Sequence, residues 1–326
     1  MTLEQILAKL ARNAIKISME PMAQESDADK ASAHSDIRAE HESCADSIPA
    51  VLSRFGGRPD VPSDFVWPVY APEWMPEGRP LAFLLQINCA ELKELDDQSL
   101  LPDHGLLSFF YDLEELQLGD SKDDFGCGQV LWFEETDNLS PASYPEKLPE
   151  DSHFPEALLK FSSRKTLPSW EEMCEITGIT LEDDHYMECC DRVLGSERPF
   201  ILNATEILGW PDVLQAPLFS QCDRLMPPLA DNKAQLEQSG KEAQPGAQDG
   251  AQHGDHPDSD AAAPSSSDIK DIPASLRWQQ LLQLDGVSLP DFNLGFGDDG
   301  MLNFCISTDD LKERRFERTW VIYQSC

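Results

Sequence analysis

The side chains with the clearest potential for chemistry are His185 and Cys189, which stand four residues apart in a segment of helical pattern. Residues at this spacing lie on one face of a helix, so an imidazole and a thiolate here could bind zinc together. Asp183, Asp184 and Cys190 are their neighbours. A zinc site also needs a second pair of ligands, and the sequence provides none at a suitable spacing. We therefore expect an ordinary acidic helix, with no metal and no other cofactor.

A second candidate for chemistry is the thiol of Cys127. It lies between Gly126 and Gly128, which predicts a flexible turn and an accessible side chain. No histidine is near it in the sequence to act as a base, so nucleophilic catalysis at Cys127 is only a hypothesis.

Two glycine-rich stretches resemble ligand loops but lack the required residues. No Lys-Ser/Thr follows Gly56 and Gly57, and the prolines after them prevent a helix from starting, which excludes a phosphate-binding loop. Residues 295–300 lack the ligand pattern and closing glutamate of a calcium-binding EF-hand loop, and they predict a hairpin turn instead.

Two glutamines occupy the same place in two similar apolar segments, Gln86 in residues 84–88 and Gln283 in residues 281–285. A buried amide is normally satisfied by hydrogen bonds. We favour a bond to neighbouring backbone across an axis that relates two repeats, with ligand binding as the alternative.

These segments belong to a longer internal repeat. Residues 105–116 align with residues 300–311 without a gap, and residues 57–61 align with residues 209–213. Three blocks in the same order indicate an internal duplication. We predict an α+β protein in which two duplicated strand–helix–strand halves form a mixed or antiparallel sheet.

Hydrophobic periodicity and turn residues place the elements of these halves. Strands are predicted over residues 13–19, 81–88, 105–111, 129–133, 278–284, 301–306 and 320–324. Helices are predicted over residues 3–11, 113–116, 180–193 and 308–314, and a further helix with a capping box starts at Ser169, with Glu172 at its third position. Residues 20–47 predict an exposed loop.

The domain organisation follows from composition. Residues 1–52 form an N-terminal helix, strand and exposed loop, and residues 53–226 hold the first repeat, a helical connection and the start of the second repeat. Residues 227–275 have no aromatic side chain, so we predict a disordered, low-complexity linker. Residues 276–326 complete the second repeat, and residues 53–326 form one domain with this linker as an insert.

The charge restricts the partners. The chain has 60 acidic residues against 25 Lys and Arg, a net charge of −35 and a pI of about 4.3. Such a field repels nucleic acid and anionic membranes and attracts a basic protein. Residues 91–160 alone carry 18 acids and four lysines. We expect Asp96, Asp97, Asp123 and Asp124 to be exposed loop charges. Taken alone, an acidic surface more often serves solubility, and the binding of a basic partner is the alternative interpretation of these charges.

The cysteines favour a cytoplasmic protein. Nine cysteines are an odd number, no two form a C-x-x-C pair, and several lie in apolar runs, as reduced thiols do. The first residues lack the basic and apolar regions of a signal peptide, and no window is apolar enough to span a membrane.

The repeated blocks also carry a family resemblance. They are FGG at 55–57, WP at 67–68, PLAFLLQIN at 80–88, GLLSFFYD at 105–112, LGWPD at 208–212, LLQLD at 281–285, GDDG at 297–300 and the tail 320–326. In this order the blocks resemble the YwqG-like family, which implies a soluble α+β protein with duplicated halves, no established activity and a hint of an immunity role. The chain departs from the family where Thr205 and Glu206 stand in place of an expected histidine.

Three classes of function fit these observations. We favour an acidic interaction protein, of immunity or toxin-neutralising type, that binds a basic protein. A small-ligand module could instead use an aromatic cleft between the repeats, lined by Trp67, Trp74 and Trp210. An enzyme acting through scattered acids or a thiol is the third class, and we do not expect it. The candidate binding residues are Gly56, Gly57, Pro59, Trp67, Gln86, Gly209, Trp210, Pro211 and Gln283.

Overall fold

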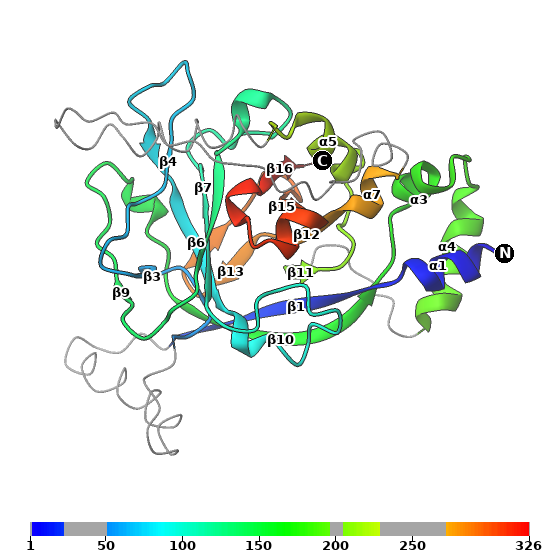
Figure 1. Cartoon of the computed structure of the whole chain (residues 1–326), viewed down its shortest axis with the longest axis horizontal. Coiled ribbons are helices and arrows are strands. Elements are labelled where there is room, and N and C mark those ends of the chain that lie inside the picture. The colour runs from blue at the N-terminus through cyan, green and yellow to red at the C-terminus, as the bar shows by residue number, and fades with distance from the viewer. Residues whose placement is uncertain (1, 23–50, 196–204, 229–271, 326) are drawn as a thin grey trace, which may run out of the picture.

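The dominant feature of the computed structural model is a ten-stranded sheet in the order β16-β15-β12-β11-β1-β10-β2-β6-β7-β8 (Figure 1). The structure describes residues 2–22, 51–195, 205–228 and 272–325. All ladders of the sheet are antiparallel. The described chain thus combines helices with a large antiparallel sheet, as expected for an α+β protein.

Two long strands, β1 (Arg12–Pro21) and β10 (Ala157–Thr166), pair along their whole length at the centre of the sheet. Beside β10 lies the first half-sheet, made of β2 (Arg54–Phe55), β6 (Ala82–Asn88), β7 (Leu106–Tyr111) and β8 (Gly128–Phe133). Beside β1 lies the second half-sheet, made of β11 (Glu206–Leu208), β12 (Trp278–Leu284), β15 (Met301–Ser307) and β16 (Trp320–Gln324). In each half-sheet the strands follow one another outward in chain order.

The inner faces of the two half-sheets pack against each other. Phe109 of β7 and Phe304 of β15 meet edge to face, with ring centroids 5.4 Å apart. Nearly every residue of β6, β7, β12 and β15 is buried, which explains why their sequences are almost continuous apolar runs. The main hydrophobic core therefore lies between the half-sheets.

Different elements cover the outer faces. On the second half-sheet, α5 (Leu218–Leu225) and α7 (Ala274–Arg277) enclose a cluster that contains Trp210, Cys305 and Trp320. On the first, an irregular excursion packs Phe65 and Trp67 against Phe110. Short ladders stabilise this excursion: β3 (Asp60–Val61) with β9 (Ser140–Pro141), and β4 (Val69–Tyr70) with β5 (Arg79–Pro80).

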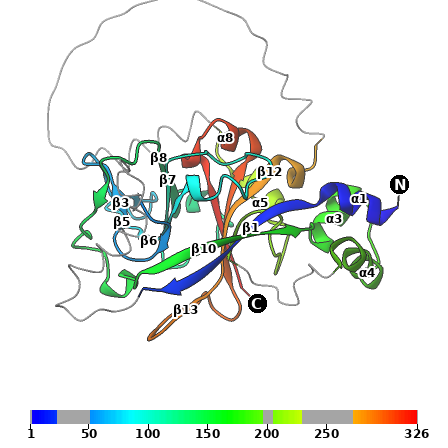
Figure 2. The same cartoon turned by 90° about the horizontal axis from the view of Figure 1, so that it is seen from below.

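Three helices form a separate group at the end of the molecule where the chain starts (Figure 2). They are α1 (Leu3–Leu10), α3 (Trp170–Thr177) and α4 (Asp183–Leu194). Thr2 and Gln5 make a capping box at α1, and Gly178 ends α3 in the left-handed region at φ 69°. Their apolar faces bury Leu7 against α3 and α4 residues.

The remaining short elements connect these parts. They are η1 (Cys89–Glu91), η2 (Lys122–Asp124), η3 (Glu150–Ser152), the hairpin β13 (Val287–Leu289) and β14 (Phe292–Leu294), α8 (Thr308–Lys312) and η6 (Phe316–Arg318). No helix in the described ranges has the length and apolar composition that crossing a membrane requires. The seven cysteines among these residues are all free.

Several predicted elements differ from the structure. Residues 113–116 form turns, so a helix follows the repeated strand only in the second half, where it is α8. Residues 295–300 join β14 to β15 and are not the turn of a hairpin. The central strand β10 was not predicted. The described part of the predicted linker includes Ala274, which is buried in α7; residues 23–47 and 229–271 lie outside the described residues.

Candidate functional site

Each of the two matched glutamines holds a loop of its own half-sheet. Gln86 accepts a hydrogen bond from the backbone N–H of Asp60 at 2.9 Å and donates to the Asp60 carboxylate at 2.8 Å. Gln283 does the same with Asp212, at 2.8 and 2.9 Å. We call these pairs the first anchor (Gln86–Asp60) and the second anchor (Gln283–Asp212). The expected bond across an axis between repeats is wrong, because β2, β10, β1 and β11 separate the two glutamines.

The glycines beside the anchors shape the same two loops. Gly56 and Gly57 have φ of 64° and 66°, and Leu208 and Gly209 have φ of 62° and 81°, all in the left-handed region. A Cβ on Gly56 would lie 2.2 Å from the carbonyl oxygen of Pro155. These candidate residues, with Pro59 and Pro211 that follow them, therefore serve the backbone path that brings each aspartate to its glutamine.

The two anchors differ in the charge placed next to them. Arg54 of β2 pairs in register with Gln86, and its guanidinium lies 2.5 Å from the Asp60 carboxylate. The residue in register with Gln283 is Glu206 of β11. Thus the strand residue in register with the glutamine is a cation in the first half-sheet and a carboxyl group in the second.

Glu206 is compensated from the central strand instead. Its carboxylate accepts a hydrogen bond from Arg164 of β10 at 2.5 Å. Burial raises the pKa of Glu206 to about 7; the nearby Asp212 charge raises it further and Arg164 opposes the shift. Sequence analysis identified Glu206 only as a departure from the family pattern, and nothing in the sequence pointed to Arg164 as its partner.

A second buried carboxyl group lies on α3. Glu172 is fully buried, and neither of its carboxylate oxygens has a hydrogen-bond partner among the described residues, so the expected capping box at Ser169 is not formed. Burial raises the pKa of Glu172 to about 8, against the attraction of Arg12. Its spacing of four residues from the partly buried Ile176 could have placed it on the apolar face of the helix.

Arg12 is itself held in a buried position. Its guanidinium lies 3.6 Å from the centre of the Trp210 ring and donates to the carbonyl oxygens of Ser275, at 2.8 Å, and Trp278, at 3.3 Å. Burial lowers the pKa of Arg12 to about 10. The contacts join β1 to α7 and to the loop after β11, so Arg12 ties the outer cover of the second half-sheet to its centre.

These groups are poorly placed for catalysis. A carboxyl group with a pKa near neutrality suits general acid–base chemistry, provided that it can reach a substrate. Glu172 and Glu206 are both 0% exposed. Cys127 is also buried, contrary to the expected accessible turn, and burial holds the pKa of its thiol well above the ordinary value. Each of these side chains is enclosed by the protein.

The aromatic and metal candidates do not assemble into sites. Trp210 is buried in the cluster under α5 and α7, on the outer face of the second half-sheet. Trp67 packs against the main core and Trp74 is exposed, so the three do not line one cleft. The sulfur of Cys189 lies 3.8 Å from Nε2 of His185, but no group of three His, Cys, Asp or Glu among the described residues could hold a metal ion.

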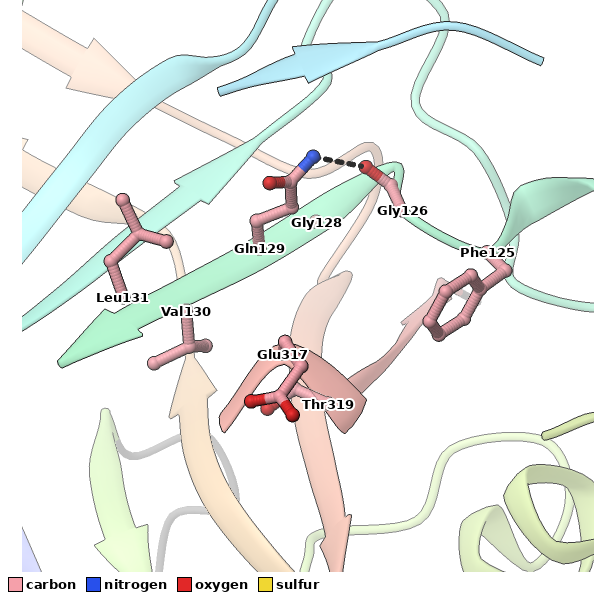
Figure 3. A pocket seen from close by; sticks show the side chains of 8 residues that line it. All are labelled: Phe125, Gly126, Gly128, Gln129, Val130, Leu131, Glu317 and Thr319. Atoms are coloured by element: carbon pink, nitrogen blue, oxygen red, sulfur yellow. Dashed lines mark hydrogen bonds between the residues drawn. The ribbon is translucent and has the colours of Figure 1, made fainter. Parts of the chain in front are cut away.

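Two small hollows lie on the first half-sheet side. One, of about 60 Å³, lies between β8 and η6, where the side chains of Glu317 and Thr319 face the strand (Figure 3). The other, of about 250 Å³, is lined in part by Lys93, Asp103 and Arg314. Arg314 donates to three backbone carbonyl oxygens and Lys93 pairs with Asp103 at 3.3 Å, so these charges hold the walls together.

Comparison with known proteins identifies a family. The model of a family described as a domain of unknown function (DUF1963) matches residues 53–326. No curated protein matches the chain. The matched region contains both anchors and every strand of the large sheet except β1. The chain therefore belongs to this family of domains of unknown function.

Proposed function

We propose that this protein is an interaction protein whose acidic surface binds a positively charged protein, and that the neutralisation of a basic toxin is the form this binding takes. The observation that carries the proposal is the imbalance of exposed charge over residues 91–160. Four lysines are exposed there, Lys93, Lys122, Lys147 and Lys160. The exposed acids are Glu91, Glu94, Asp97, Asp103, Glu114, Glu115, Asp120, Asp123, Glu134, Glu135, Asp137, Glu146, Glu150 and Asp151.

The structure separates these surface acids from acids with a structural role. The expectation that Asp96 and Asp124 are exposed is wrong. Asp96 accepts a hydrogen bond from the N–H of Leu101 at 2.8 Å, and Asp124 closes a capping box with Ser121. Only Asp97 and Asp123 of the four expected residues belong to the acidic surface.

A surface of this sign favours a basic partner for electrostatic reasons. Summed negative charge accelerates encounter with a cationic protein and slows it with nucleic acid or anionic lipid. The buried position of the titratable carboxyl groups supports binding over catalysis. Seven free thiols among the described residues support a reducing compartment such as the cytoplasm.

The matched anchors support two finer inferences. We infer that the half-sheets arose by duplication, because Gln86 and Gln283 make the same two bonds to the aspartate of a Pro-Asp pair. We also infer that the chain is YwqG-like within its family, because the blocks that carry that resemblance include Gln86 of the first anchor and both residues of the second.

Charge-matched variants test the proposal. Glu114→Gln, Asp120→Asn and Asp123→Asn together remove three exposed charges from the acidic surface. The control removes three exposed charges at the start of α4, at Glu182, Asp183 and Asp184. Pull-downs from the native cell identify the partner, and stopped-flow measurements then give its association rate.

We expect the first variant to associate about threefold more slowly at low salt, and the control to behave as wild type, because steering depends on where the charge lies. Association of the wild type should fall about tenfold between low and physiological salt. Equal recovery of the same proteins by all three chains would show that the acids serve solubility alone.

A further inference from the structure

The excursion between β3 and β6 presents apolar side chains to solvent. Val66 is 68% exposed and Trp74 is 55% exposed. Glu73, Pro76 and Glu77, which flank Trp74, are exposed as well. We call residues 72–78 the tip. It lies at the end of the molecule opposite α3 and α4 (Figure 1). Tryptophan is enriched among the residues that contribute most to protein–protein binding, so an exposed indole is a candidate contact point.

The strand that leads into the tip, β4, is held by hydrogen bonds to the rest of the first half-sheet. Gln129 of β8 donates to the carbonyl oxygen of Val69 at 3.1 Å, and the hydroxyl of Tyr70 donates to the carbonyl oxygen of Asp123 at 3.0 Å. The Trp74 ring meets the Tyr70 ring edge on, with centroids 6.5 Å apart. The indole is therefore presented on a fixed support, and little conformational entropy is lost when a partner binds it.

The negative charge around the tip favours a positively charged partner there. Glu73 and Glu77 are exposed and lie one and three residues from Trp74 in the sequence, and the bond from Tyr70 places the acidic segment 120–124 next to the strand that leads into the tip. Arg79 at its base is already paired with Asp112 at 2.6 Å and Glu115 at 3.4 Å. An aromatic face next to carboxylates suits a guanidinium or ammonium group, which gains from both the ring and the negative charge.

We propose that Trp74 is the anchor point for an arginine or lysine side chain of a basic partner, with Glu73 and Glu77 as its counter-charges. This inference rests on the proposed function and names the place where the partner docks. A second copy of this chain is a poorer occupant, because it would bring one acidic surface against another.

The test uses a fluorescein-labelled hexa-arginine peptide as a probe of cationic binding, with fluorescence anisotropy as the readout. Trp74→Ala removes the ring, Trp74→Phe keeps an aromatic face, and Ile179→Ala is a control of similar exposure, 59%, beyond the end of α3. We expect Trp74→Ala to weaken binding about tenfold and Trp74→Phe about threefold, with no change for Ile179→Ala. Thermal midpoints should be unchanged, because the ring is more than half exposed.

The outcomes separate this inference from the proposed function. If Trp74→Ala binds as wild type while the variant at residues 114, 120 and 123 binds more weakly, the docking point is wrong and the acidic surface still binds the cation. If wild type does not bind the peptide at low salt, both are wrong. A concentration-dependent dimer in sedimentation that Trp74→Ala abolishes, with peptide binding unchanged, would assign the tip to a second copy.

Discussion

The two half-sheets build the same anchor and place side chains of opposite charge next to it. In the first, Arg54 on the strand next to Gln86 pairs with the Asp60 carboxylate. In the second, the corresponding strand position carries Glu206, whose partner Arg164 comes from β10. The amide–aspartate bonds are the same within 0.1 Å in both halves, at 2.8 to 2.9 Å.

The difference shows which part of the anchor the fold requires. A buried polar group must be hydrogen-bonded, and the glutamine meets that need for a loop N–H and a carboxylate at once. A buried charge must be neutralised, but the neutralising group can come from any strand or be replaced by a proton. The backbone clamp is therefore fixed in both halves, while the sign of the neighbouring charge is free to change.

The largest expected effect on stability comes from removing the Arg54 guanidinium. Arg54→Met should lower the free energy of unfolding by about 3 kcal/mol, the lower end for a broken buried pair, because it leaves the largely buried Asp60 carboxylate, 14% exposed, without its cation. Arg54 also donates to the backbone carbonyl oxygen of Arg58, a bond that the variant loses as well. Urea denaturation at pH 6 measures the change.

Arg164→Met is the matched variant in the second half-sheet. At pH 6 Glu206 already holds a proton in the folded state, since its pKa is about 7, so the loss of Arg164 should cost less than the loss of Arg54. Equal losses in the two variants would show that protonation does not replace the cation, and the contrast drawn between the halves would fail.

The glutamines should have equal effects. Gln86→Leu and Gln283→Leu each remove the acceptor for an aspartate N–H and a donor to its carboxylate, and each should cost about 2–3 kcal/mol. Chemical denaturation of both variants under one set of conditions gives the comparison. Exposed Gln98→Leu is the control and should change stability little. A large effect in one half only would mean that the two anchors share geometry but not importance.

Two buried glutamates should make stability depend on pH, Glu172 on α3 and Glu206 beside the second anchor, and the Glu206 contribution can be isolated. An unfolded glutamate has a pKa near 4.5, and burial raises that of Glu206 to about 7. Between these values the folded protein holds a proton that the unfolded chain has released, so the stability contribution of Glu206 falls as the pH rises through this window.

Glu206→Gln removes this titration. Relative to wild type, the variant should gain on the order of 2 kcal/mol between pH 5 and pH 8. Exposed Glu182→Gln is the control and should follow wild type at every pH. Thermal or urea unfolding across this range is the measurement, and a constant difference between Glu206→Gln and wild type would contradict the raised pKa.

Sequence patterns predicted strands such as β12 and β16 well, because nearly every residue of these strands is buried and their sequences are almost continuous apolar runs. The predicted strands 278–284 and 320–324 coincide with β12 and β16. β10 was missed because its C-terminal half, Phe161-Ser162-Ser163-Arg164-Lys165-Thr166, is polar and only partly buried. Its strand conformation depends on the ten-residue ladder with β1, a contact between segments about 145 residues apart that periodicity does not record.

The sequence predicted some features of the candidate site correctly and others incorrectly. The matched positions of Gln86 and Gln283 correctly marked two buried amides, since a polar residue in an apolar strand needs a partner. The expected backbone partners were right, since the N–H groups of Asp60 and Asp212 donate to the two amides. The expected position across an axis was wrong, because Asp60 and Asp212 reach the glutamines through loops whose path depends on left-handed residues. Exposure of Asp96 and Asp124 was misjudged for a related reason: short caps bury acids that composition alone assigns to the surface.

In each half-sheet a row of polar residues runs across the strands in register: Arg54, Gln86 and Ser108 in the first, and Glu206, Gln283 and Asn303 in the second. The smallest expected effect on stability concerns the last residue of each row. Ser108 is in register with Gln86, and Asn303 is in register with Gln283; both are 0% exposed. The Ser108 hydroxyl and both amide atoms of Asn303 have no hydrogen-bond partner among the described residues. A buried hydroxyl without a partner costs stability, and its removal leaves little empty space. Ser108→Ala should therefore be neutral or stabilising by about 0.5 kcal/mol.

Asn303→Ala is the matched change and should destabilise, because it removes a larger side chain and leaves a cavity in a packed layer. Paired urea titrations of the two variants measure the contrast. A loss above about 1 kcal/mol for Ser108→Ala would mean that the hydroxyl is bonded in solution, for example to a trapped water. The polar row beside each anchor would then be a hydrogen-bonded network that extends past the glutamine, and the clamp would include the third strand of each half-sheet.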